Sequence, residues 1–592
     1  MRTLVTCFLM LLLAVSGAVA ATEVVLSNSR DWTDVYSVEI FGFLQGTTPM
    51  FLVSERHGTI ILTRTLKETP VRVYSSKNPF VIGMRGTLVG QGFLNITEET
   101  PDNINLALGR RTNVTRFIIT DPTYGYNAIA LGSYAVLTRS WIIFADRNNL
   151  NTVLDFLGER KVDSILVYGQ VDREVREALT SYPLEIINEA GDRFANNVEI
   201  VKRYKALADS RQVLMSNGEF IEGDLIGGGY PVLFIGKQNV PDKIAEYVRN
   251  SNIEVGVLIG NDLVSTATFV RRQLGISTFV KFARSGRNPT GPINEVEGLD
   301  VFYVPVLQLG IGIDSIVYNK VTSQLQVNLR NFVGVPTYFK GTYTVQDGQN
   351  TQVVGDLDPL FIDKGANKTV TYAMSPLSSD EVTAKAFVIF GESKGALELI
   401  LSQAFNVSVV AVTDESDIII EKVVFDKNKN RFDVVIKNVG SVDSYVRTEL
   451  VDFLVDGIPR SYASPSTLHL RPGERGRSFI PAELTDADRD ANPLVAVRAY
   501  YGKDPGALFK ILDWKGQISV KSFDLWTWLP LIIILLLIIL IILARRRKKK
   551  KHGQNGGHGP AHQHAHGHHA PAAEAGHHAA PGHKEDSAGT KT

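Results

Sequence analysis

The chain has 592 residues, an apolar content of 44%, and 62 basic against 62 acidic residues. This length suffices for about three to five domains, and the zero net charge lacks the basic excess typical of nucleic-acid-binding proteins. The single cysteine, Cys7, lies in a segment that we expect to be removed, which excludes disulfides, thiol catalysis and cysteine-based metal sites in the mature protein.

Residues 1–20 have the pattern of a secretory signal peptide. Arg2 is followed by an apolar run that reaches Val15, and a cleavage site of small residues ends at Ala20. A buried first strand or an uncleaved anchor is the alternative. The pattern predicts export of the chain.

From Glu23 to about Gly291, apolar runs of strand length alternate with helical stretches. Unbroken apolar strands separated by helices are typical of parallel sheets covered on both faces. The second unit reads as a strand, a polar Gly-containing stretch, a strand at 141–144, a helix at 148–161, a strand and a helix. The third unit repeats this order and the first is a looser copy. We therefore expect three tandem α/β units at residues 22–110, 111–210 and 211–310.

These units resemble the cell wall-binding repeat 2 family, which occurs in tandem, often in threes, on bacterial and archaeal surface proteins. The resemblance rests on four features, which are Gly191-Asp192-Arg193-Phe194 entering a helix, Ser216, Pro231-Val232-Leu233 and Ile259-Gly260. The third unit has Ser285-Gly286-Arg287 without the acidic residue, and the first has no clear counterpart.

The resemblance implies units packed around a pseudo-threefold axis that bind anionic wall polymers. The guanidinium of Arg193 is a planar fork suited to phosphate or carboxylate. Asp192 and Arg193 are therefore the candidate ligand-binding residues. The alternative is that Asp192 caps the helix and Arg193 forms a structural ion pair.

After Gly291 the pattern changes to alternating strands and turns, which predicts two Ig-like β-sandwiches at residues 311–397 and 398–518. The segment 326–336 parallels 434–442. Each leads to an Asp-Gly pair, at Asp347-Gly348 and Asp456-Gly457, which favours a hairpin.

A strand that ends in Asn-x-Gly and is followed by a later Pro-Gly turn resembles the CARDB family of Ig-like domains. These domains are common as stalks on archaeal surface and S-layer-related proteins. The resemblance implies a spacer role, with Asn438 and Gly440 forming a turn and binding no ligand.

We find no catalytic or cofactor motif. The run Asp486-x-Asp488-x-Asp490 lacks the Gly and Glu of a calcium loop, and Gly227–Gly229 lacks the Lys-Ser/Thr of a phosphate loop. A nucleophile elbow and an H-E-x-x-H sequence are also missing. We predict no enzyme activity and no cofactor, although a hydrolase with paired carboxylates stays open as an alternative.

Residues 525–544 have one polar side chain, Thr527, and the length of a membrane-spanning helix. Trp526 and Trp528 stand at one end, where indole rings favour the headgroup layer. Seven consecutive cations, Arg545–Lys551, follow at the other end. The positive-inside rule places the tail, residues 545–592, in the cytoplasm.

The tail is rich in Gly, Ala, Pro and His and has no apolar periodicity, so we expect disorder. Its cations should attract anionic lipids. Five closely spaced histidines form a candidate site for a divalent metal, namely His562, His564, His566, His568 and His569. A solvated tail that binds metal only adventitiously is the alternative.

Four N-glycosylation sequons lie between the signal peptide and the membrane helix, as export requires. Their acceptors are Asn95, Asn113, Asn367 and Asn406.

Together these patterns predict a cell-membrane protein with one span, an extracellular ectodomain and no nucleic-acid partner. The three α/β units would bind envelope polysaccharide or a surface-layer protein, and the sandwiches would hold them above the membrane. One alternative is a surface-layer component or its anchor that self-assembles. Another is a surface glycan hydrolase with acidic residues in a cleft.

Overall fold

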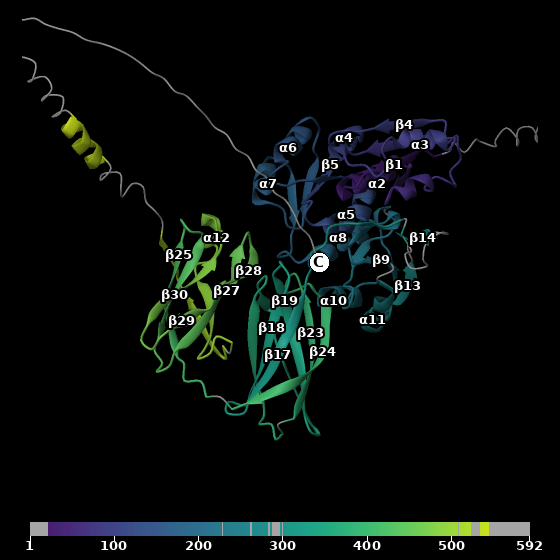
Figure 1. The fold of residues 1–592 in the computed structure, drawn as a ribbon. Coiled ribbons are helices and arrows are strands. Elements are labelled where there is room, and N and C mark those ends of the chain that lie inside the picture. The colour runs from purple at the N-terminus through teal and green to yellow at the C-terminus, as the bar shows by residue number, and fades with distance from the viewer. Residues whose placement is uncertain are drawn as a thin grey trace, which may run out of the picture. The chain divides into compact units, whose positions relative to one another are not determined.

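Three parallel four-stranded sheets follow one another along the chain in the computed structural model (Figure 1). The structure describes residues 22–227, 229–260, 263–281, 285–286, 297–298, 300–379, 381–411, 413–506, 508–521 and 533–543. By its internal contacts the chain divides into two parts, Met1–Ser522 and Phe523–Thr592. All features below belong to the first of these two parts unless stated.

Each sheet places its first strand between its second and third strands. The first has the order β2-β1-β3-β4, the second β6-β5-β7-β8 and the third β11-β9-β12-β13. Their bounds are β1 (Val24–Asn28), β2 (Thr48–Phe51), β3 (Val71–Ser75), β4 (Ile96–Glu99), β5 (Arg116–Thr120), β6 (Trp141–Phe144), β7 (Ser164–Tyr168), β8 (Leu184–Ile187), β9 (Gln212–Ser216), β11 (Val232–Phe234), β12 (Val255–Ile259) and β13 (Ser277–Lys281). The parallel-sheet α/β prediction is confirmed, and the first unit is as complete a copy as the others. We call these three units the head.

A helix follows the first strand of each sheet, and these three helices contact one another. They are α2 (Trp32–Gln45), α5 (Gly125–Thr138) and α9 (Gly223–Ile226). The prediction of a polar connection in the second unit was wrong, because residues 125–138 are helical. Ile129, Leu131 and Ala135 are all buried in a helix covered on most sides. A helix of this kind lacks the polar face that makes amphipathic periodicity visible.

The remaining helices of the head cover the sheets or connect the units. The covering elements are α3 (Met84–Gly90), α6 (Leu150–Gly158), α7 (Arg173–Ala178), α10 (Asp242–Arg249), α11 (Val264–Leu274), η1 (Arg56–Thr59) and η2 (Leu179–Ser181). The connecting helices are α4 (Ile104–Arg111) and α8 (Arg193–Leu207). The helix expected at 148–161 corresponds to α6, and the later helices expected in the second and third units correspond to α7, α10 and α11.

Each connecting helix bonds to the backbone of the next unit through a buried asparagine. Asn105 of α4 donates to the carbonyl of Ile142 in β6 at 2.9 Å. Asn197 of α8 donates to the carbonyl of Val232 at 2.9 Å and accepts from the amide of Phe234 at 2.7 Å. Both contacts engage the second strand of the following sheet, so they fix each unit against its neighbour.

Two acidic side chains come close together among the central helices. Glu39 of α2 is buried, with 2% of its surface exposed, and Glu222 caps α9. Burial, reinforced by the charge of Glu222, raises the pKa of Glu39 to about 8. The proton of Glu39 is therefore retained in the folded state at pH values where the unfolded chain has released it.

Replacement of Glu39 by glutamine should reduce the loss of stability that the protein shows as the pH rises. For a carboxyl group with a raised folded-state pKa, stability falls as pH rises from about 4.5 to about 8. We expect the urea midpoint of the wild type to fall further between about pH 5 and about pH 9 than that of Glu39→Gln. Parallel profiles for the two proteins would contradict this.

After the third unit the chain returns to the first. β16 (Phe302–Tyr303) pairs with β10 (Phe220–Ile221) of the third unit. The ring of Phe302 also meets those of Phe51 and Phe80 in the first unit, with centroids 6.1 and 6.3 Å apart. This return segment therefore ties the first and third units together. Two short strands, β14 (Ser285–Gly286) and β15 (Glu297–Gly298), precede it.

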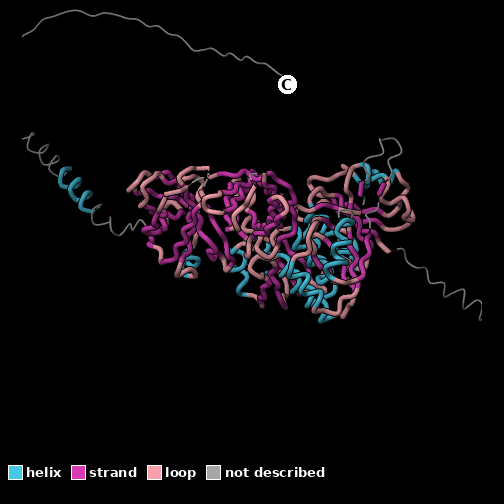
Figure 2. The backbone as a smooth tube through the Cα atoms, turned by 90° about the horizontal axis from the view of Figure 1, so that it is seen from below, coloured by secondary structure: helices cyan, strands magenta, loops and turns pink. Residues whose placement is uncertain are grey.

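The described residues from 311 to 521 form strands joined by loops, with one short helix. Figure 2 shows strands and loops predominating away from the helical part of the molecule. The first β region has its own core and an eight-stranded sheet with the order β20-β19-β23-β24-β17-β18-β22, in which β21 also pairs with β19. Its strands are β17 (Ile311–Asn319), β18 (Gln324–Asn331), β19 (Thr337–Asp347), β20 (Asn350–Gly355), β21 (Leu360–Ile362), β22 (Asn367–Ala373), β23 (Val382–Gly391) and β24 (Leu397–Val410). Because β24 pairs with β23 and β17, the predicted boundary at residue 397 lies too early.

The second β region has a separate core and two sheets, with orders β30-β26-β25-β33 and β28-β27-β31-β32, and β29 paired with β27. Its elements are β25 (Ile418–Asp426), β26 (Arg431–Asn438), β27 (Ser444–Val455), β28 (Ile458–Ala463), β29 (Leu468–Leu470), β30 (Arg475–Pro481), α12 (Asp486–Asp490), β31 (Val495–Gly502), β32 (Lys510–Gly516) and β33 (Ser519–Lys521).

The two segments that repeat in the sequence of the β regions make the same hydrogen bonds in the structure. Asn331 and Asn438 are fully buried, and each donates to the carbonyl four residues later at 2.8 Å. Each also accepts from the amide two residues later, at 3.0 and 2.9 Å. Asn438 is therefore a turn former, as predicted. The hairpins at Asp347-Gly348 and Asp456-Gly457 are also confirmed.

Part of the predicted membrane helix is described. Residues 533–543 are helical, and the other residues of 525–544 lie outside the described part. Within the described residues, no helix has the length and apolar character needed to cross a membrane. The predicted signal peptide, 1–20, and the tail, 545–592, also lie outside the described residues.

Candidate functional site

The two residues predicted to bind ligand lie where the head meets the first β region. Asp192 is the N-cap of α8, and its carboxylate accepts from the amides of Phe194 and Ala195 at 2.9 and 3.2 Å. Burial raises its pKa. This is the capping role that the sequence offered as the alternative.

Arg193 is buried, with 7% of its surface exposed. Its guanidinium forms an ion pair with Glu398 and lies 3.5 Å from the carboxylate of Glu392. It also packs over the ring of Tyr126 at 5.0 Å. Burial alone would lower the pKa of Arg193, but the charges of Glu398 and Glu392 hold it above its usual value.

The pKa values of the two glutamates are raised as well, which for a carboxyl group favours the neutral form. Burial raises the pKa of Glu392 to about 7, against the lowering effect of Arg193. Burial also raises the pKa of Glu398. We call Asp192, Arg193, Glu392 and Glu398 the head junction. Arg193 is thus engaged by the protein itself, and its contact with a ligand stays a prediction.

The sequence did not indicate the partners of Arg193. Glu398 lies 205 residues further along the chain, at the start of β24, and no motif marks it or Glu392. The capping pattern around Asp192 was the one local signal at this site.

A groove of about 1970 Å³ opens beside the head junction. It runs along the carboxyl ends of strands in the second α/β unit and is walled by both β regions. Asp192, Glu392 and five tyrosines are among its lining residues, the tyrosines being Tyr124, Tyr126, Tyr247, Tyr338 and Tyr462. Crevices at the carboxyl ends of parallel strands are the usual ligand sites of α/β sheets.

A second ionic contact joins the second α/β unit to the second β region. Arg173 of α7 pairs with Asp456 and with Asp488, the latter at 2.9 Å. Although burial alone would raise the pKa of Asp488, hydrogen bonds from the backbone of Asp456 and from Thr485 lower it to about 2. The acidic run at 486–490 therefore has a structural role. No cluster of potential metal ligands occurs among the described residues.

The first α/β unit has its own, smaller cleft of about 870 Å³ at the carboxyl ends of its strands. The charged groups there are already paired within the protein. Asp31 caps α2, Asp102 pairs with Lys77 at 2.9 Å and Asp34 accepts from Ser29 at 2.8 Å. Burial raises the pKa of Asp34 to about 6.

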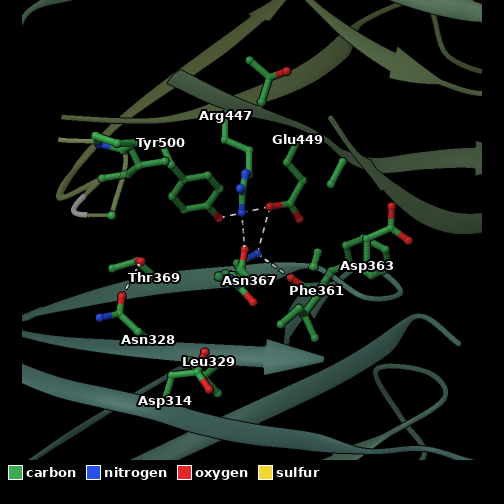
Figure 3. A pocket seen from close by; sticks show the side chains of 18 of the residues that line it. Asp314, Asn328, Leu329, Phe361, Asp363, Asn367, Thr369, Arg447, Glu449 and Tyr500 are labelled. Atoms are coloured by element: carbon green, nitrogen blue, oxygen red, sulfur yellow. Dashed lines mark hydrogen bonds and ion pairs between the residues drawn. The ribbon is translucent and has the colours of Figure 1, made fainter. Parts of the chain in front are cut away.

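A cavity of about 270 Å³ separates the two β regions. Figure 3 shows Arg447, Glu449 and Tyr500 pointing from one side toward Asn367 and Phe361 on the other. The buried ammonium of Lys368 lies 2.8 Å from Glu449, which also accepts from Tyr500 at 3.1 Å. Burial alone would lower the pKa of Lys368, but Glu449 raises it. This pair of opposite charges is balanced.

No protein-family model matches the chain. No curated protein matches it either. Among solved structures, elastase-activated Escherichia coli alpha-2-macroglobulin aligns at 13% identity and a TM-score of 0.13, over 38% of this chain and 23% of the macroglobulin. The periplasmic chaperone SfaE aligns at 11% identity and 0.13, over 36% and 100%. A Porphyromonas gingivalis W83 protein of unknown function aligns at 12% and 0.15, over 35% and 99%. None of these similarities identifies a family.

The other predicted sites divide between described and undescribed residues. All four sequon asparagines are exposed, as attachment of a glycan requires, namely Asn95, Asn113, Asn367 and Asn406. The predicted metal ligands lie outside the described residues, namely His562, His564, His566, His568 and His569.

Proposed function

We propose that this chain is a non-enzymatic, membrane-anchored cell-surface protein whose head binds an envelope polymer or a surface-layer partner in the groove. The groove at the carboxyl ends of the second sheet carries this proposal. Its volume of about 1970 Å³ is roughly twice the upper end of the 300–1,000 Å³ typical of small-molecule pockets. An extended chain suits such a space better than a metabolite.

The repeats support the same proposal. Three sheets of identical strand order, with their central helices in mutual contact, fit the pseudo-threefold packing implied by the cell wall-binding repeat 2 family. The two β regions, with their shared asparagine turns, fit a stalk of CARDB-like, Ig-fold domains. The export signal, sequons and apolar span in the sequence fit anchorage with the head outside the cell.

A steric plug in the groove tests this function. Gly334 lines the groove, and a Cβ added there meets no atom within 4 Å, so Gly334→Trp should fold normally. We expect the full chain in detergent to be retained on isolated envelope, and Gly334→Trp to weaken retention by about tenfold.

Gly158→Trp is the matched control, because Gly158 is equally unhindered and stands at the end of α6 away from the groove lining. It should bind as the wild type does. Equal retention of both variants would place the binding surface elsewhere. A wild type that stays unbound while forming ordered arrays would favour self-assembly.

A further inference from the structure

The two buried ionic contacts to the first β region differ in their charge balance. At the cavity between the β regions, one cation, Lys368, meets one anion, Glu449. At the head junction, one guanidinium, Arg193, serves both Glu392 and Glu398, and the carboxylate of Asp192 lies close by. Buried charges are costly unless they are paired. The head junction therefore has fewer cations than carboxylates.

Glu392 is the carboxylate left without a full partner. Its Oε1 atom is buried without a hydrogen bond and lies 3.5 Å from Nε of Arg193, a separation beyond hydrogen-bond geometry. The neighbouring hydroxyl of Ser393 is also buried and unbonded. Burial raises the pKa of Glu392 to about 7, and the charges of Glu398 and Asp192 act in the same direction.

The other charged groups around Glu392 do not correct the deficit. Arg193 is shared with Glu398. Tyr126 lowers the pKa of Glu392 through a side-chain hydrogen bond, but it adds no positive charge, and burial raises its own pKa. Lys237 is committed to Glu219 at 2.6 Å. The exposed ammonium of Lys243 acts on Asp192, and its effect is reduced by solvent.

Glu392 also faces the groove. The side chain keeps 12% of its surface exposed and lines the groove together with Asp192 and Ser393. A positively charged group of a ligand in the groove would therefore come beside a carboxylate that shares the guanidinium of Arg193 with Glu398.

We propose that the groove recognises a glycan whose sugars carry free amino groups, with one ammonium placed beside Glu392 as the missing cation. This inference rests on the proposed function and names its ligand class. The partly exposed rings of Tyr124 and Tyr462 on the groove walls offer flat faces for sugar rings, and aromatic faces also attract ammonium groups. The assignment differs from the anionic polymer that the family resemblance implies.

Two oligosaccharides that differ only in acetylation test the proposal. The probes are a glucosamine tetrasaccharide and its fully N-acetylated form, titrated calorimetrically into the full chain in detergent at about pH 7. We expect the free amine form to bind about tenfold more tightly, because acetylation removes the charge. Equal affinities, or no binding of either probe, would overturn the inference.

Glu392→Gln should bring the two affinities within about twofold of each other. This variant removes a surplus buried charge and keeps the shape of the side chain, so its thermal midpoint should not fall. Glu185→Gln, at an exposed ion pair with Arg203 outside the groove lining, is the control and should keep the full preference. A preference that survives in Glu392→Gln would overturn the assignment of the ammonium to this residue.

Two further comparisons separate the remaining outcomes. Tetralysine that binds as tightly, with the same dependence on Glu392, would assign the ammonium to a protein partner and overturn the glycan assignment. Envelope retention that depends on Gly334 but shows no preference between the two oligosaccharides would leave the proposed function standing and reject this inference alone.

Discussion

Replacement of Arg193 by methionine is expected to destabilise the protein by about 3–5 kcal/mol. The substitution leaves Glu392 and Glu398 buried together with no cation, which is the costly way to break a buried ion pair. Methionine keeps most of the side-chain volume, so the loss is electrostatic. The measurement is the free energy of unfolding in urea for the first transition, followed by tryptophan fluorescence.

Lys202→Met on the same helix is the matched control for Arg193. Lys202 forms an exposed pair with Glu199 one turn away, with 52% of the lysine side chain exposed. Exposed pairs of this kind contribute about 0.2–1 kcal/mol, so this variant should unfold close to the wild type. Equal losses in the two variants would mean that the head junction is not a buried ionic contact.

Replacement of Asn197 by leucine should cost about 2–5 kcal/mol, because it leaves two buried backbone groups without partners. Asn197 has no exposed surface and bonds to both Val232 and Phe234. Leucine can satisfy neither group. The second and third units should then separate at lower urea concentration, which hydrogen exchange at β11 would detect.

Asn105→Leu provides the internal comparison. Asn105 makes one bond to a backbone carbonyl, that of Ile142, and one to the hydroxyl of Ser37, which can reorient. The loss should therefore be smaller than for Asn197→Leu. The reverse order would contradict the role given to the connecting helices.

Elements with a clear local period could be predicted from the sequence. Helix α10 and the turn at Asn438 have local causes, an amphipathic pattern in one and an asparagine that bonds its own backbone in the other. Helix α5 could not be found in this way, because Ile129 and Leu131 belong to a helix that is buried on most sides. The predicted domain boundary at residue 397 lies too early for a related reason. Strand β24 belongs to the first β region because it pairs with β23 and β17, and such pairing is not visible in the local sequence.

The candidate site shows the same division. The Gly-Asp-Arg motif predicted that a helix starts at Asp192, and the hydrogen bonds that Asp192 accepts as the N-cap explain this start. The ion-pair partners of Arg193 could not be predicted. Glu392 and Glu398 lie about 200 residues further along the chain, and no local sequence pattern identifies them as its partners.

The sequence by itself determined the repeat, the strand and helix content of most units, and the turns, because these follow from interactions between residues close together in the chain. Only the tertiary structure decided that three central helices meet, that both β regions wall a groove at the second sheet, and that Glu392 shares the guanidinium of Arg193 with Glu398. These features depend on burial and on charge balance between distant segments, and neither quantity exists until the chain has folded.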